Sequence, residues 1–129
     1  MSEYTVVNMR NVEDQAEKFG LSPQLEARFA RVPLEAELVG ITDQRMAPNL
    51  KLPWGHSHKT QEEVYVVISG SVRAKLGDDI VDLGPWDAVR VHKDTMRGFE
   101  AGPDGAELLA VGAPGGPGDA ELVQNWWTD

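Results

Sequence analysis

The chain has 129 residues, the length of one domain that can bury a core without staples. Its 12 basic and 21 acidic residues give a net charge of −9, so phosphate backbones would repel it and we expect no nucleic-acid partner. It contains no cysteine, which excludes disulfides and thiolate metal sites.

Short apolar or alternating runs recur along the chain between Gly, Pro and Asp, and they predict an all-β protein. The extended segments expected in chain order are Tyr4–Met9, Glu26–Val32, Glu37–Met46, Leu50–His58, Glu63–Ser69, Ser71–Leu76, Ile80–Leu83, Asp87–Val91, Arg97–Ala101 and Glu107–Val111. The polar segment Asn11–Phe19 is expected to form a short helix or an ordered arm. Close, regular strand spacing without helical periodicity between the strands predicts a sandwich or a small barrel.

The C-terminal part changes character at Gly112, where a run rich in Gly and Pro begins. It leads to Glu121–Asp129, which contains Trp126 and Trp127. We expect a flexible connector with an apolar hook, because two adjacent tryptophans are rarely left in water. The sequence leaves open whether the hook docks on its own barrel or on a second subunit.

Nothing in the sequence indicates a membrane or an exported protein. The first 14 residues contain no apolar segment of the kind found in secretory signals, and the longest purely aliphatic or aromatic run, Val64–Ile68, is far too short to span a bilayer. We therefore expect a cytoplasmic protein without a membrane partner.

Two of the three histidines, His56 and His58, lie two residues apart. Positions i and i+2 of an extended segment point to the same face, so both imidazoles would face one way. A carboxylate from a neighbouring strand, Glu62 or Glu63, would complete a ligand set that suits iron, manganese, nickel, copper or zinc. The spacing does not choose between the two glutamates. The third histidine, His92, is expected at the surface.

The stretch around these histidines resembles the first motif of the cupin superfamily. That motif runs Gly, five residues, His-x-His, three or four residues, Glu, six residues, Gly. Here His56-x-His58 is followed after four residues by Glu63 and after six more by Gly70, while Leu50 stands at the opening glycine. Counting back from Gly70 selects Glu63 as the third ligand. The resemblance implies a double-stranded β-helix, the jelly-roll barrel of cupins, with a single domain over residues 1–129, a core over about 37–114 and a tail over 115–129.

The second cupin motif is degenerate in this chain. It runs Gly, five residues, Pro-x-Gly, two residues, His, three residues, Asn, and its defining positions are here occupied by Trp86, His92, Asp94, Arg97 and Ala101. Metal-binding cupins generally take a fourth ligand from the histidine of this motif. Arg97 stands at that place, and an arginine is a permanent cation that cannot bind a metal.

Two interpretations follow. In the first, His56, His58 and Glu63 hold a divalent metal with open positions, and Arg97 binds an anionic substrate such as a small organic acid. In the second, Arg97 pairs with Glu63 in the metal's place, and the chain is a metal-free module that binds or senses a small ligand. If the chain is an enzyme, the resemblance implies a dioxygenase-like or isomerase-like metal-dependent cupin.

Three aromatic residues are further candidates for the substrate pocket. Tyr65 follows Glu63 by two positions and Phe99 follows Arg97 by two, so each is expected to share the inward face of its strand. Trp54 precedes His56 by two and is expected to form a pocket wall. Core packing is the alternative explanation for all three. Cupins commonly pair through their sheets, so the resemblance also implies a homodimer.

Overall fold

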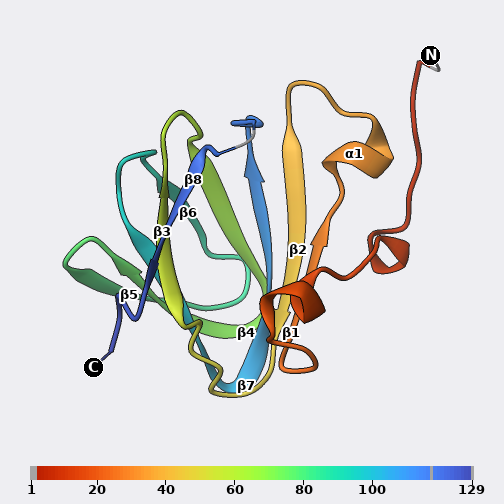
Figure 1. Cartoon of the computed structure of the whole chain (residues 1–129). Coiled ribbons are helices and arrows are strands. Elements are labelled where there is room, and N and C mark those ends of the chain that lie inside the picture. Colours follow the sequence, from red (N-terminus) through yellow and green to blue (C-terminus); the bar gives the residue numbers. More distant parts are fainter. Residues whose placement is uncertain (1–2, 117, 129) are drawn as a thin grey trace.

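The computed structural model describes residues 3–116 and 118–128, and within them the chain is almost entirely β-structure (Figure 1). Its strands are β1 (Leu25–Phe29), β2 (Gly40–Met46), β3 (Trp54–His58), β4 (Glu63–Leu76), β5 (Asp79–Leu83), β6 (Ala88–Val91), β7 (Arg97–Gly112) and β8 (Ala120–Gln124). The helical elements are the 3₁₀ turns η1 (Met9–Asn11) and η2 (Ala16–Phe19) and the one-turn helix α1 (Arg31–Leu34). The strands form one curled antiparallel sheet, and the expectation of an all-β double-stranded β-helix is confirmed.

Strands β4 and β7 pair with each other and connect most of the other strands of this sheet. Strand β7 pairs with β2, β3 and β4, and β4 also pairs with β5 and β6, so most of the barrel is joined through these two. Each is one long strand where the sequence suggested two shorter ones. The pairing shifts register on either side of Gly70, where φ is +73°. A Cβ at Gly70 would lie 2.0 Å from the carbonyl oxygen of Gly105, so this bend needs a glycine.

The core lies on the concave face of the sheet. Alternation along β4 turns Glu63, Tyr65 and Val67 inward, and along β7 it turns Arg97 and Phe99 inward. The buried apolar residues that pack around them include Leu25, Ala27, Met46, Leu52, Val72, Ala74, Val91, Ala101, Leu108 and Ala110.

The N-terminal segment differs from its prediction. Tyr4–Met9 was expected as a strand, but residues 4–8 form no strand, and Tyr4 and Val6 are 78% and 84% exposed. An alternating segment becomes a strand only where it pairs with the edge of a sheet, and here the segment is an arm that leads to Arg10, which donates a hydrogen bond to Glu107 at 3.0 Å. The predicted strand Glu26–Val32 also ends early, at Phe29, because Pro33 suits the first turn of a helix rather than a strand.

The C-terminal segment also corrects the sequence interpretation. Residues 120–124, expected as part of a flexible tail, form strand β8 and pair with the whole of β3. The hook after it docks on the chain's own barrel: Trp127 is 6% exposed, and the ammonium of Lys51 lies 4.4 Å from its ring centroid. Among the described residues no helix is long and apolar enough to cross a membrane.

Candidate metal centre

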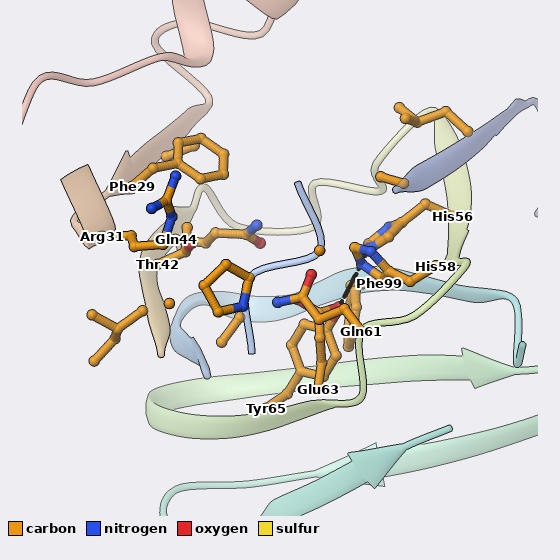
Figure 2. A pocket seen from close by; sticks show the side chains of 18 of the residues that line it. Phe29, Arg31, Thr42, Gln44, His56, His58, Gln61, Glu63, Tyr65 and Phe99 are labelled. Carbon is orange, nitrogen blue, oxygen red and sulfur yellow. Dashed lines mark hydrogen bonds and ion pairs between the residues drawn. The ribbon is translucent and has the colours of Figure 1, made fainter. Parts of the chain in front are cut away.

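The two neighbouring histidines and Glu63 meet inside the barrel. His56 and His58 lie two positions apart on β3 and face the same side, and Glu63 begins β4 opposite them (Figure 2). The Nε2 atoms of His58 and His56 lie 3.0 Å and 3.6 Å from Oε1 of Glu63. One ligand atom from each of the three residues lies within 4.8 Å of the others. Glu62 points outward and pairs with Arg90.

These separations fit three ligands of one ion. Ligands about 2.1 Å from a metal, in tetrahedral or octahedral directions, lie about 3.0 to 3.4 Å from one another. The two distances to Glu63 bracket that range. Two imidazoles and one carboxylate form the donor set found in non-haem iron sites and in many zinc sites, and it leaves coordination positions open. The residues present therefore fit a divalent transition metal.

Asp119, which the sequence analysis did not single out, holds His58 in place. Its Oδ2 lies 3.0 Å from Nδ1 of His58, while its Oδ1 accepts hydrogen bonds from the backbone and hydroxyl of Thr60 at 2.9 Å and 2.6 Å. A carboxylate behind a histidine fixes the ring and leaves Nε2 free to bind a metal. Asp119 precedes β8 and is 61 residues from His58, so only the pairing of β8 with β3 brings them together.

The resemblance to the second cupin motif puts Arg97 at the place of a fourth ligand. Arg97 lies opposite His56 in the pairing of β3 with β7, and it is fully buried. Its Nη1 lies 3.3 Å from Oε1 of Glu63, and its Nη2 donates to the carbonyl oxygen of His92 at 2.8 Å. The guanidinium thus lies behind the carboxylate, and Arg97 is not among the residues that line the pocket.

The surroundings set the charges of this cluster. Burial alone would raise the pKa of Glu63, but hydrogen bonds from His56, His58 and Tyr65 and the charge on His58 lower that pKa far below its usual range. Burial likewise works against the charged form of His58, yet its bonds to Glu63 and Asp119 raise its pKa overall. Burial and the charge of Glu63 raise the pKa of Tyr65, which donates its hydroxyl hydrogen to Oε1 of Glu63. The cluster therefore holds an ionised carboxylate at neutral pH.

A cavity of about 590 Å³ opens in front of the cluster, within the range of about 300–1,000 Å³ typical of small-molecule sites. Trp54, Tyr65 and Phe99 line it, as do all three candidate ligands. The structure thus places these three aromatic candidates at the pocket, where their role in substrate binding stays a prediction. Its walls are mostly apolar, and they include Leu25, Ala27, Phe29, Val32, Ile41, Leu52, Ala110, Ala120 and Leu122.

Sequence reasoning also missed Arg31, the one Lys or Arg side chain among the described lining residues. It belongs to α1, where the sequence predicted a strand. Figure 2 shows Arg31, Thr42 and Gln44 on the side of the pocket away from the two histidines.

The fold of this chain is similar to those of solved structures with which it shares little sequence identity. No protein-family model and no curated protein matches this chain. A cupin protein (BF4112) from Bacteroides fragilis is 17% identical with a TM-score of 0.72, over 100% of this chain and 99% of that one. The polyketide cyclase RemF from Streptomyces resistomycificus is 20% identical with a TM-score of 0.73, over 100% and 89%. KdgF from Halomonas sp. is 14% identical with a TM-score of 0.67, over 88% and 94%. The chain therefore has the fold of the cupin superfamily, as its first motif implied.

Proposed function

We propose that this chain is a metal-dependent cupin that binds a small organic acid in its barrel. The observation that carries the proposal is the convergence of His56, His58 and Glu63, with ligand atoms within 4.8 Å of one another, in the lining of a cavity of small-molecule size. Iron, manganese, nickel, copper and zinc all suit this donor set. When bound, the metal supplies a Lewis acid or, as iron, a centre that activates oxygen.

The chain's own residues have separable roles in this proposal. Asp119 accepts the Nδ1 hydrogen of His58 and so presents Nε2 to the pocket. Tyr65 and Arg97 both donate to Oε1 of Glu63, which holds the carboxylate ionised and fixes its rotamer. His56, His58 and Glu63 would hold the ion, and because all three line the cavity, a small ligand or water would have access to it.

Elemental analysis of protein purified without a metal-binding tag, before and after reconstitution with each metal, tests the proposal. We expect one metal per chain in the wild type, and near-complete loss in His56→Ala and His58→Ala. His92→Ala is the matched control, because His92 lies outside the cluster with its side chain 58% exposed. A wild type that binds no metal after reconstitution, or a His58→Ala variant that binds as much as the wild type, would falsify the proposal.

A second candidate function is favoured by the ion pair of Arg97 with Glu63. In this case the pair stands where a metal would, and the chain is a metal-free module that binds or senses a small ligand. The metal contents of the wild type and of Arg97→His together separate the two functions. If a fourth ligand is all that the centre lacks, the variant binds metal more tightly than the wild type. If the pair replaces the metal, wild-type protein binds none and its ligand affinity is insensitive to chelators.

The expected homodimer and cytoplasmic location stay predictions. Light scattering coupled to size-exclusion chromatography tests the first, with an expected mass of twice the 14.2 kDa chain. A monomer at all concentrations would contradict the dimer and would leave the metal proposal untouched, because all three ligands come from one chain.

A further inference from the structure

The cavity has two chemically different ends. At one end lie His56, His58 and Glu63, the candidate metal ligands. On the opposite side lies Arg31, beside Thr42 and Gln44 (Figure 2). Between the two ends the walls are formed mainly by aliphatic and aromatic side chains. A ligand that fills the cavity must therefore present an apolar body between two polar ends.

Arg31, rather than Arg97, is the cation available to a ligand. Arg97 is fully buried behind Glu63. Its Nη1 donates a hydrogen bond to Glu63, and its Nη2 donates one to the carbonyl oxygen of His92. Arg31 is exposed at the cavity and makes a single long bond, from Nη1 to the carbonyl oxygen of Ala36 at 3.4 Å. Its other guanidinium hydrogens are free of any bond found among the described residues, and a planar fork of this kind matches a carboxylate.

Charge supports an anion at this end. Glu63 is the one carboxylate among the described lining residues, and it is already compensated by Arg97. Among the described lining residues, no other acidic group competes for Arg31. In a chain of net charge −9 this local cation is what would make an anionic ligand tolerable.

Apolar side chains line the cavity from buried positions in the core to exposed positions at its rim. Phe19, Phe29 and Leu122 line the cavity and remain 47%, 45% and 55% exposed. Deeper in, the rings of Tyr65 and Phe99 contact each other with centroids 4.7 Å apart and planes tilted by 48°, and both residues are about 2% exposed. The apolar surface thus runs from the core to the mouth, which suits a ring-bearing ligand better than a two-carbon or three-carbon acid.

We propose that the ligand is an amphipathic organic acid, with a ring-bearing apolar body between the walls and its carboxylate on Arg31. This inference rests on the proposed function only for the end of the ligand that meets the metal. The anion anchor is on α1, outside both cupin motifs, and differs from the one that the motif position of Arg97 suggested.

Two fluorescent probes test the inference without knowledge of the natural ligand. 8-Anilinonaphthalene-1-sulfonate has an aromatic body with an anionic group, and N-phenyl-1-naphthylamine has the same body without it. In chelator-treated wild-type protein we expect the anionic probe to bind about tenfold more tightly, the lower end of what a charge-assisted hydrogen bond contributes. Arg31→Gln should abolish that preference and leave the neutral probe's affinity unchanged.

Arg45→Gln is the control, because Arg45 is another partly exposed arginine and pairs with Glu26, away from the cavity. Equal binding of the two probes to the wild type, or an equal effect of the Arg31 and Arg45 variants, overturns the inference. So does an anion preference that survives Arg31→Gln and disappears in His58→Ala, since the anion would then be read at the metal end. Metal content is measured in parallel. That metal content is taken from reconstituted wild-type protein that has not been treated with chelator. No probe preference in the wild type together with one metal per reconstituted chain overturns this inference alone, and a clear preference together with no metal after reconstitution overturns the metal proposal alone.

Discussion

Replacing Arg97 with Met tests how the buried arginine and a metal share Glu63. The substitution keeps most of the side-chain volume but removes the cation 3.3 Å from Oε1 of Glu63, in a position with no exposure. Breaking a buried ion pair costs about 3–5 kcal/mol, because the remaining charge is left uncompensated. Glu63 keeps its hydrogen bonds to Tyr65 and His58, so we expect the lower end, about 3 kcal/mol, in metal-free protein. For a chain of this size that lowers Tm by about 10 °C.

A bound divalent ion should restore most of this loss, because it compensates the charge of Glu63 in place of the arginine. What remains is the lost bond from Arg97 to the carbonyl oxygen of His92, about 1 kcal/mol. The assay is thermal unfolding with and without saturating Zn²⁺, and we expect zinc to raise the Tm of Arg97→Met by about 6 °C more than that of the wild type. Arg90→Met is the control: its exposed pair with Glu62 at 3.4 Å contributes about 0–1 kcal/mol. An equal zinc-induced shift in wild type and Arg97→Met refutes the reasoning.

Three further substitutions probe the sheet around the site. Asp43 is buried, and its pKa is raised to about 6 by burial and by the neighbouring Glu107. The folded state therefore binds this proton more tightly than the unfolded chain, whose value is 3.8, and stability is full at low pH and falls as pH rises through the window from 3.8 to about 6. Two units at about 1.36 kcal/mol each give at most about 3 kcal/mol. In Asp43→Asn the free energy of unfolding, measured in urea at a series of pH values, should no longer fall across this window. A pH dependence equal to that of the wild type would contradict the assignment. Asp119→Ala should weaken metal binding about 10- to 100-fold in competition with a chelating dye, whereas an affinity equal to that of His92→Ala would show that the carboxylate does not orient its histidine. Trp127→Ala should lower the free energy of unfolding by about 3–5 kcal/mol at every protein concentration, and a loss that varied with concentration would indicate docking on a partner.

The parts of the site that could be predicted from sequence depend on short-range geometry. His56 and His58 share a face because strand residues alternate, and Glu63 follows on the next strand after a short loop. Alternation does not choose between Glu62 and Glu63, and the resemblance to the first cupin motif, counted back from Gly70, selects Glu63. These features lie within one stretch of fifteen residues, where alternation and the motif spacing are sufficient.

The parts of the site that could not be predicted depend on contacts between segments that lie far apart in the sequence. Asp119 follows a glycine-rich run with no periodicity, and its role exists only because β8 pairs with β3. Arg31 was assigned to a strand, and a helix of four residues has too few positions to show a helical period. The segment Tyr4–Met9 alternates as a strand would, but it is not part of any strand of the sheet.

Under the two proposals, the residues that would hold a metal and the residues that would select the ligand lie on different elements of the fold. The three candidate ligands lie on β3 and β4 in the interior of the barrel, where strand register fixes their geometry and leaves little freedom to change it. The groups that would distinguish one acid from another come from the periphery: Arg31 on α1 for the anion, and Leu122 on β8 for the rim. Strand β8 is involved in both, because the residue before it, Asp119, orients His58. If both proposals hold, a change in β8 that also moved Asp119 would weaken metal binding, whereas a change in α1 would alter ligand preference alone, so α1 would be the segment in which to redesign specificity.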